Sequence, residues 1–431
     1  MISKYEKIKK RESKMSFINA SKAIFLVFVL YMAWYKEIWG DFQIVLYGSV
    51  FLLTISTYFS ADAKGELFFE FRYLTGFYKV LLAFGIYCFI TGLVVSIYHS
   101  LLIDSMTTYF SYLVVLLDCC LISKLEDSWE WLLNDFIVVS LVCVVYTIFW
   151  GKPMLNGGAT VYTMSKLNNP HTLAFVLLMG IFGLLAKNQK NFDYVLLKMI
   201  IILLLLYGIL ITGSRKSLIS IAIFFSIWTF NLFQMQGTIS LNPHKVLVFL
   251  VVIIALIIAV WYFRRYYVGT DQFSRLMRLF GEEEDNSNQE RIRMYEVAFK
   301  TWKEHFLFGV GFNQYQLYSW RGDYSHSTYA EVFSCTGIIG AAILFIPVLN
   351  YLFQMIRYTL ISNNDNRYYY LVCLAGLSIE LFLGIGQIWI YGFFHELFLI
   401  CICGVFSHTV NLSMQSEFLL TGEKQKWKYL L

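Results

Sequence analysis

Charged residues and prolines are scarce in this chain. Only 15% of its 431 residues are Asp, Glu, Lys or Arg, whereas 58% are hydrophobic, and the mean hydropathy is +0.60. This composition leaves too little polar surface to hold a chain of this length in water. It excludes a water-soluble protein, and we expect no nucleic-acid partner. Because there are only four prolines, most apolar segments can form uninterrupted helices.

Organised cysteine pairs are also absent from the sequence. It contains eight cysteines, but most, such as Cys88, Cys143 and Cys373, fall in apolar stretches. No paired CxxC motif and no Cys/His ligand set accompanies them, which argues against a disulfide framework and against a zinc site. We therefore expect these side chains to be buried thiols.

Apolar segments suited to crossing a bilayer recur along nearly the whole chain. A hydrocarbon core about 30 Å thick needs roughly 20 mainly apolar residues per helix. Such segments lie between polar breaks at residues 17–35, 42–60, 73–98, 106–122, 131–150, 172–186, 194–212, 217–233, 246–263, 336–356, 368–388 and 393–408. The predicted fold class is therefore all-α and integral to the membrane, with about twelve transmembrane helices.

One large hydrophilic loop divides this pattern into three parts. Residues 1–263 carry the helices before the loop, residues 264–333 form the loop, and residues 334–431 carry the remaining helices and a tail. Lysines cluster before the first apolar run and after the last one, so the positive-inside rule predicts that both termini are cytoplasmic. No signal-peptide cleavage site follows the first run, which we interpret as a retained helix. An even number of spans then places the large loop, His171 and Arg215 on the extracytoplasmic side.

Residues 290–306 of the loop (ERIRMYEVAFKTWKEHF) have helical periodicity. Arg291, Tyr295, Ala298 and Trp302 fall on one face of such a helix. This pattern predicts an amphipathic helix at the membrane surface. We expect it to end before the glycines of the following FGVGF segment.

Basic residues on the predicted outer side are candidates for an anion site. Arg215 and Lys216 lie in a short turn between two apolar spans (ITGSRKS), and Arg291 and Arg293 lie on the amphipathic helix. A guanidinium binds phosphate through paired hydrogen bonds, so arginines from two segments can clamp a lipid-linked pyrophosphate. The alternative is structural, with Arg215 reaching lipid headgroups or capping a helix and Arg291 forming part of a solvated surface.

His326 lies in the polar stretch YSHSTYAEVFSCTGIIG, where the tenth predicted span begins. An imidazole that titrates near neutral pH can accept a proton from an attacking hydroxyl group. The alternative is a histidine that only makes a structural hydrogen bond.

In their order and spacing, TGSRKS, ERIRMYEVAFKTWKEHFLFGVGFNQY and HSTYAEVFSCTGIIG resemble the O-antigen ligase and polymerase superfamily, which includes the Wzy-type polymerases. The resemblance implies a GT-C-type glycosyltransferase with a large extracytoplasmic loop between helices 9 and 10. Such an enzyme takes glycans from undecaprenyl pyrophosphate and needs neither a nucleotide sugar nor an obligatory metal. We therefore expect no cofactor.

The resemblance also implies roles for individual residues. Arg215 matches the arginine that binds pyrophosphate, Arg291 matches the loop arginine, and His326 matches the histidine that activates the acceptor. Arg293 leaves the choice of loop arginine open, and Tyr295 stands where tryptophan is common. The further candidates for substrate binding are Lys216, His171 of the NNPHTLA segment, Ser327 and Tyr329.

The predicted function is the polymerisation of undecaprenyl-pyrophosphate-linked oligosaccharide repeat units into capsular, exo- or O-antigen polysaccharide. The reaction is expected on the outer face of the bacterial cytoplasmic membrane, with the lipid-linked donor, membrane lipids and a chain-length regulator protein as partners. We favour a polymerase because Tyr- and Phe-rich, Lys-rich and Pro-poor chains resemble capsule and exopolysaccharide polymerases of low-GC bacteria. The alternatives are an O-antigen ligase-like transfer to lipid A core, teichoic acid or protein, and a polysaccharide flippase, for which no internal repeat is evident.

Overall fold

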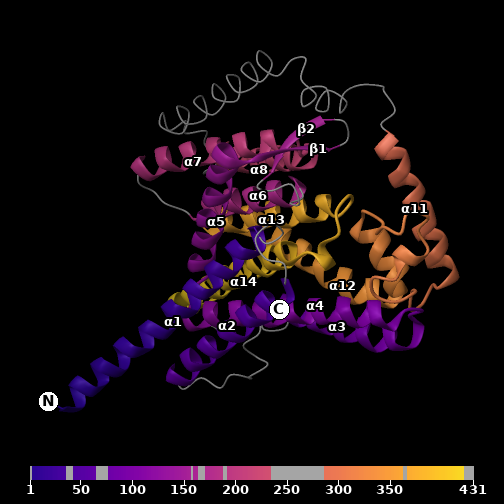
Figure 1. Ribbon diagram of the computed structural model, residues 1–431. Helices are drawn as coiled ribbons and strands as arrows, with labels where there is room; N and C mark the ends of the chain where they lie inside the picture. Colours follow the sequence, from indigo (N-terminus) through magenta and orange to yellow (C-terminus); the bar gives the residue numbers. More distant parts are fainter. Residues whose placement is uncertain are drawn as a thin grey trace.

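The computed structural model describes residues 2–34, 42–64, 76–156, 159–163, 170–187, 192–233, 286–362 and 366–421. These parts are almost entirely helical (Figure 1). The α-helices are α1 (Ile2–Trp34), α2 (Phe42–Lys64), α3 (Gly76–Val95), α4 (His99–Leu125), α5 (Glu130–Trp150), α6 (Pro170–Ala186), α7 (Phe192–Ile211), α8 (Arg215–Phe233), α11 (Asn286–Glu304), α12 (Thr328–Ile361), α13 (Asn366–Leu383) and α14 (Phe393–Thr421). In the connecting segments that the structure describes, η2 (Tyr315–Leu317) and η3 (Trp389–Tyr391) form short 3-10 turns.

Each of the other predicted spans coincides for most of its length with one of these helices, and the predicted span at residues 246–263 falls outside the described part of the chain. In that part, 5 helices are long and apolar enough to cross a membrane, namely α3, α4, α5, α12 and the Phe393–Gln415 portion of α14. The segments Phe17–Ala33, Leu46–Ala61, Pro170–Ala186 and Leu197–Ile211 form shorter apolar helices. The helical, membrane-type architecture is therefore confirmed, whereas the count of twelve spans and the GT-C arrangement stay predictions.

A short β-hairpin lies between α5 and α6 in the otherwise helical architecture. Strand β1 (Lys152–Asn156) pairs antiparallel with β2 (Ala159–Thr163), with Lys152 opposite Thr163. Pro153 follows the end of α5 and cannot extend that helix, because proline lacks a backbone N–H donor. The residues of β2, ATVYT, include the β-branched and aromatic types that favour strands. Pro170 then occupies the first position of α6, where its fixed φ is favourable.

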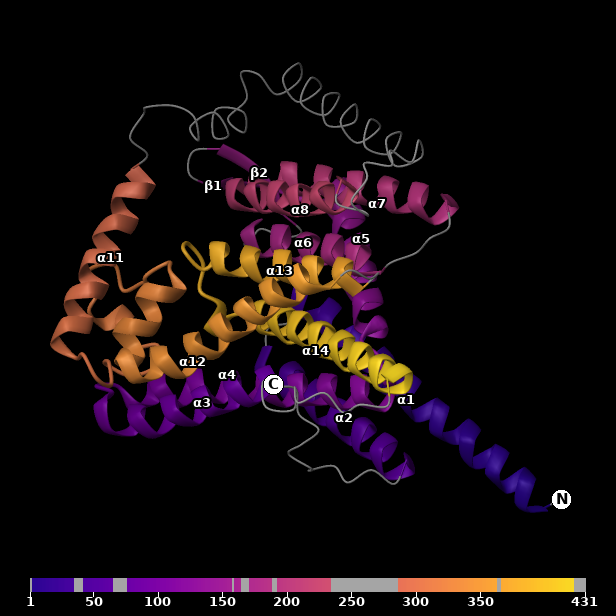
Figure 2. The same ribbon diagram turned by 180° about the vertical axis from the view of Figure 1, so that it is seen from behind.

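Helices α13 and α14 cross the middle of the molecule, with α7 and α8 on one side and α3 and α4 on the other (Figure 2). From Leu397 to Cys403, every residue of α14 is at most 1% exposed. A helix that is apolar on all sides must be surrounded by other elements, and α14 packs on α3, α4, α6 and α13. Helix α14 therefore forms the core of the bundle, and the polar segments that connect the helices lie at the two ends of the bundle.

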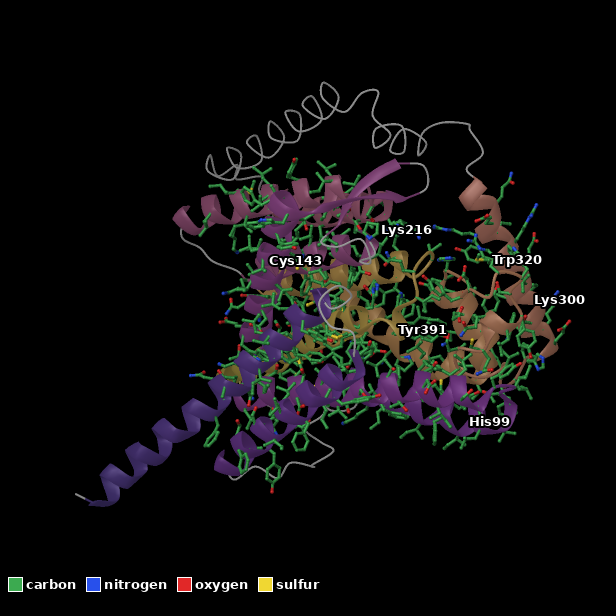
Figure 3. All side chains as sticks on the ribbon, viewed as in Figure 1. His99, Cys143, Lys216, Lys300, Trp320 and Tyr391 are labelled. Atoms are coloured by element: carbon green, nitrogen blue, oxygen red, sulfur yellow. The ribbon has the colours of Figure 1, made fainter. Side chains whose placement is uncertain are left out.

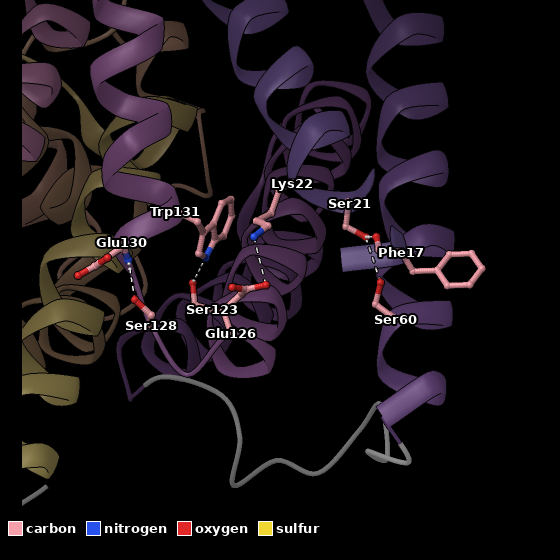
Figure 4. Close-up of polar contacts among 9 residues, drawn as sticks. All are labelled: Phe17, Ser21, Lys22, Ser60, Ser123, Glu126, Ser128, Glu130 and Trp131. Atoms are coloured by element: carbon pink, nitrogen blue, oxygen red, sulfur yellow. Dashed lines mark hydrogen bonds and ion pairs between the residues drawn. The ribbon is translucent and has the colours of Figure 1, made fainter. Parts of the chain in front are cut away.

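The described segments that connect consecutive helices, which we call links, fall into two groups according to the contacts between the helix ends. In the first group, Lys22 of α1 forms an ion pair with Glu126 at 3.1 Å, at the end of α4 (Figure 4). The same group contains the hydrogen bonds Ser21–Ser60, Trp131–Ser123, Lys187–Asn134 and Asn366–Ser413. Each of these contacts lies in or next to a link that the sequence prediction assigns to the cytoplasmic side.

The second group contains the links that the sequence prediction assigns to the other side. The side chain of Asn313 in the large loop donates a hydrogen bond to Ser105 Oγ of α4 at 2.8 Å. His171 of α6 lies 3.2 Å from Ser214, and Lys216 donates to the carbonyl of Gly386 at 2.7 Å. The alternation expected from the span count is therefore internally consistent over the described links.

The tenth predicted span begins earlier than expected. Helix α12 starts at Thr328 and not at residue 336, because Ser327 caps it with an extended backbone and a side chain that accepts a hydrogen bond from the N–H of Ala330. The polar residues after His326 are thus the first turns of a helix and not the end of a loop. Inside α12, Gly337 leaves the helical conformation at φ 67° and ψ −169°.

The segment that follows α11 fills this interruption. The N–H groups of Val310 and Gly311 donate to the carbonyls of Ser334 and Cys335 at 3.0 and 2.8 Å, and the N–H of Ile338 donates to the carbonyl of Phe306 at 2.9 Å. Backbone groups freed by a break in a membrane helix need such partners. As a result, α11 is fixed beside α12, at the opposite end of the molecule from the N-terminus (Figure 1).

The predicted amphipathic helix is confirmed as α11, which runs from Asn286 to Glu304. Its buried stripe is Met294, Ala298 and Thr301, which packs on α12, while Tyr295 and Trp302 are half-buried beside it. The predicted face is thus correct within one residue position.

Candidate active site

The link between α13 and η3 gathers three of the sequence motifs. The Lys216 ammonium donates to the carbonyl of Gly386 at 2.7 Å, and the Tyr295 hydroxyl donates to the carbonyl of Ile385 at 2.8 Å. The backbone N–H of Thr328 donates to the carbonyl of Gly384 at 2.8 Å. We call residues 384–387 the acceptor link, because its carbonyls accept hydrogen bonds from α8, α11 and the start of α12.

The acceptor link was missed in the sequence because GIGQ was assigned to the eleventh predicted span, residues 368–388. Helix α13 ends at Leu383 instead. The carbonyls beyond a helix end have no partner within the helix and must be satisfied from elsewhere. Two glycines within three residues, Gly384 and Gly386, were the signal that the helix stops here.

His326 lies at the start of α12, next to the acceptor link. Its side chain is half-buried, and its ring packs on Tyr324 with 4.6 Å between the ring centres. Its backbone has a φ of 59°, in the left-handed region that few residues other than glycine adopt. Ser325 and Ser327 on either side are buried, at 0% and 5% exposure.

Several hydrogen bonds hold the segment around His326. The Ser325 hydroxyl donates to the carbonyl of Ser327 at 3.0 Å, and the Ser327 hydroxyl donates to the carbonyl of Gly384 at 3.3 Å. The hydroxyl of Tyr329, one of the predicted binding residues, donates to the carbonyl of Leu381 at 2.7 Å. Ser327 and Tyr329 therefore connect the His326 segment to the end of α13.

The electrostatic surroundings of His326 favour its neutral form. Burial lowers the pKa of His326 from its ordinary value of 6.5, and the positive charges of Arg291, Lys216 and Arg321 lower it further, while Asp323 opposes them. These charges act on the imidazole only because the structure brings α8, α11 and the start of α12 together. A neutral imidazole is the form that can accept a proton.

The two arginines of α11 differ in their surroundings. Arg291 is half-buried, whereas Arg293 is exposed. The charge of Arg291 also opposes the rise that burial causes in the pKa values of Tyr295 and Tyr324. Arg291 therefore faces the site around His326, which favours it over Arg293 as the loop arginine.

Arg215 begins α8, directly after the buried Ser214 and before Lys216. The Ser214 hydroxyl lies 3.2 Å from Nδ1 of His171 and 2.9 Å from the Ser217 hydroxyl. The backbone of the TGSRKS turn is thus fixed against α6, at the same end of the bundle as the acceptor link. The side chain of Arg215 lies outside the described part of the structure.

An ion pair ties the segment before His326 to the start of α11. Arg321 contacts Glu290 at 2.6 Å and Asp323 at 3.5 Å. Lys216 lies on the side of the helical core that faces α11 and Trp320, whereas Lys300 lies on the outer side of α11 (Figure 3). The charged residues around His326 therefore come from three elements that are remote in sequence.

A second buried pair lies deeper in the bundle. His395 of α14 contacts Glu380 of α13 at 2.6 Å and stacks on Phe175 of α6 with 4.0 Å between ring centres. Among the residues that the structure describes, no three His, Cys, Asp or Glu side chains are grouped as metal ligands. The candidate site thus combines cations, hydroxyls and the His326 imidazole with the carboxylates that pair with Arg321.

Part of the chain, including the motifs of this site, matches a known protein family. Residues 200–345 match the model of a family described as O-antigen ligase. The match spans the TGSRKS turn, α11 and the His326 segment, and it confirms the resemblance of these motifs to the O-antigen ligase and polymerase superfamily. No curated protein matches the chain.

Proposed function

Since residues 200–345 carry an O-antigen ligase-type domain, we propose that the chain is a membrane glycosyltransferase that polymerises lipid-linked oligosaccharides. The donor is an oligosaccharide on undecaprenyl pyrophosphate, and the acceptor is a sugar hydroxyl of a second repeat unit. The observation that supports this proposal most strongly is the convergence of α8, α11 and the His326 segment on the acceptor link.

In the proposed reaction, His326 takes the proton from the acceptor hydroxyl as its oxygen attacks the anomeric carbon of the donor. The bond between that carbon and the pyrophosphate oxygen breaks, and its electron pair leaves with the lipid pyrophosphate. Arg215 and Arg291 bind this leaving group and stabilise the charge that develops on it. A single displacement inverts the anomeric centre.

We also propose that Lys216, Arg293, His171 and Tyr295 contribute to substrate binding. The Lys216 ammonium donates a hydrogen bond to the carbonyl of Gly386, so its positive charge lies beside the acceptor link. Tyr295 uses its hydroxyl to bind the acceptor link, so its role in the reaction is indirect. His171 contacts Ser214, the residue before Arg215, and therefore orients the TGSRKS turn.

The competing function is a ligase that transfers the finished glycan to lipid A core, teichoic acid or protein. Both reactions use the same donor and leaving group, so the site chemistry is shared, and the acceptor distinguishes them. We favour the polymerase, acting on the outer face of the bacterial cytoplasmic membrane with a chain-length regulator.

The test uses purified protein in nanodiscs with lipid-linked repeat units as the only glycan. A polymerase produces a ladder of products, whereas a ligase produces no elongation until a separate acceptor is added. The variants Arg215→Ala, Arg291→Ala and His326→Ala should each lose product. The matched control is Lys300→Ala, which removes an exposed cation on the outer side of α11. Full activity in both Arg215→Ala and His326→Ala would refute the assigned site, and the absence of any product with either acceptor would refute the function.

A further inference from the structure

Glu331 is a buried carboxylate in the first turn of α12 that no sequence motif singled out. The side chain is 0% exposed. Its Oε2 accepts a hydrogen bond from the backbone N–H of Ser325 at 2.8 Å, and its Oε1 accepts one from the Tyr391 hydroxyl at 3.0 Å. The thiol of Cys335 adds a longer contact to Oε1 at 3.6 Å. Both carboxylate oxygens thus bind donors from outside the first turn of α12.

Tyr391 extends this contact into the large loop. Its hydroxyl accepts a hydrogen bond from the backbone N–H of Asn313 at 3.1 Å while it donates to Glu331. The side chain of Asn313 in turn donates to Ser105 of α4 at 2.8 Å. Glu331 therefore connects the residue before His326 to η3, to the loop after α11 and, through that loop, to α4.

His326 lies between two fixed points. Ser325 is held on its N-terminal side by Glu331, and Ser327 is held on its C-terminal side by the carbonyl of Gly384. Between them, His326 adopts a φ of 59°, a left-handed conformation that is strained for any residue other than glycine. Such a conformation persists only where the surrounding contacts enforce it.

Removal of the carboxylate would release the first of these points. Ser325 is buried, so without the carboxylate its backbone N–H would be left without a hydrogen-bond acceptor and out of reach of water. An unsatisfied buried donor is unfavourable, so the segment would shift to find another acceptor. The backbone at His326 could then relax toward an ordinary conformation, which would turn the imidazole away from Tyr324 and from the charges of Arg291 and Lys216.

We propose that Glu331 is the positioning residue for His326, which it holds in its strained conformation through the backbone of Ser325. The role of His326 as the base rests on the proposed function. Glu331 is 0% exposed, so its carboxylate presents no surface to a substrate. The carboxylate accepts two hydrogen bonds at once, from the backbone N–H of Ser325 and from the Tyr391 phenol. A glutamine amide has only one acceptor oxygen, so its NH2 group would face one of these two donors and that hydrogen bond would be lost in its present form.

The first test is Glu331→Gln in nanodiscs with lipid-linked repeat units. We expect kcat to fall about tenfold or more while KM for the donor stays nearly unchanged, because a hydrogen bond to a charged group is lost and the donor-binding arginines are untouched. Tyr391→Phe should reduce kcat in the same direction but less. Glu380→Gln, which neutralises an equally buried carboxylate paired with His395, is the control for the effect of burial alone.

A double variant separates positioning from general damage to the fold. If Glu331 acts through His326, adding Glu331→Gln to His326→Ala should cause no further loss of the residual transfer rate. A purely structural role would lower that residual rate again. Further loss in the double variant, or a full wild-type kcat in Glu331→Gln, would overturn the proposal.

Hydrogen exchange gives a readout that needs no activity. In Glu331→Gln, the amides of residues 319–328 should exchange faster than in the wild type, whereas those of α14 should be unchanged. If the wild type makes no product, the proposed function fails, and the exchange alone decides whether Glu331 holds the His326 segment. Unchanged exchange in residues 319–328 would overturn the inference even in an active enzyme.

Discussion

Gly309 and Gly337 leave no room for a side chain, because each lies against the backbone just before the other. A Cβ on Gly309 would lie 2.3 Å from the carbonyl carbon of Cys335, and one on Gly337 would lie 2.2 Å from the carbonyl oxygen of Leu307. Both residues also have positive φ, 70° and 67°. This reciprocal contact is what locks the end of α11 onto the interruption of α12.

Gly337→Ala should destabilise the protein strongly, because it adds a backbone clash to the strain of a positive φ. Gly322→Ala is the matched control, since Gly322 has nearly the same φ of 69° but no atom within 4 Å of its Cβ position. The control isolates the φ strain alone, about 1 kcal/mol. The temperature at which half of the purified protein remains monodisperse in detergent should fall clearly more for Gly337→Ala. Equal shifts in the two variants would refute the close approach.

Activity should fall on the acid side at a pH below 6.5, the ordinary pKa of histidine. His326 must be neutral to accept a proton, and burial together with Arg291 lowers its pKa, so protonation and inactivation occur only at a lower pH. In Arg291→Gln, the pKa should rise, and the acid limb of the profile of the residual kcat/KM against pH should move to higher pH. The exposed Arg293 provides the control: Arg293→Gln should leave the acid limb in place. If both variants move the limb equally, Arg291 is not the residue that faces His326.

Asp323→Asn should move the same limb in the opposite direction. The negative charge of Asp323 raises the pKa of His326 against the influence of burial and the cations. Its removal should therefore keep His326 neutral, and the enzyme active, to a lower pH. An acid limb that moves to higher pH in this variant would show that another group controls it.

The sequence predicted the helices well and the contacts between them poorly. Apolar runs mark helices directly, because a segment in the bilayer must satisfy its own backbone N–H and C=O groups with internal hydrogen bonds, as a helix does. The role of the GIGQ segment depended on Lys216 and Tyr295, which lie at least 90 residues away, and no local pattern encodes such pairings. The same holds for Glu331: a single acidic residue at the start of a helix is common, and only its contacts with Ser325 and Tyr391 distinguish it.

The cations and the imidazole of the candidate site could be proposed from the sequence, because a motif shows which residue types are present. What the sequence left open was the choice between Arg291 and Arg293, two residues apart on one helix. Helical geometry places them on different sides of α11, but which side faces His326 follows from how α11 packs on α12 through Met294 and Ala298.

Tyr295→Phe should weaken the connection between α11 and the acceptor link while α11 keeps its packed stripe. The hydroxyl donates to the carbonyl of Ile385 at 2.8 Å, and loss of a neutral hydrogen bond costs about 0.5–1.5 kcal/mol. We expect the transfer rate to fall by a few-fold to about tenfold, with little change in thermal stability. The control is Tyr318→Phe, because the Tyr318 ring packs on His305 at 6.0 Å and its hydroxyl has no hydrogen-bond partner in the described part of the chain. Equal loss in both variants would contradict a specific role for Tyr295.

The orientation of the site can be tested by cysteine labelling, because the eight native cysteines are all buried and should give little background. Trp320 is 54% exposed beside the His326 segment, so Trp320→Cys should react with a membrane-impermeant maleimide in intact cells. Glu130→Cys is the matched control: Glu130 is also exposed, but it lies with Glu126 and Lys22 in the group of links predicted to be cytoplasmic. It should react only after the membrane is permeabilised. Trp320 and Glu130 lie in different groups of links, at opposite ends of the bundle. If one of them is on the other side of the membrane from the predicted one, the second must be as well. The reverse labelling pattern would therefore put His326, Arg291 and the acceptor link in the cytoplasm, and would refute transfer at the outer face.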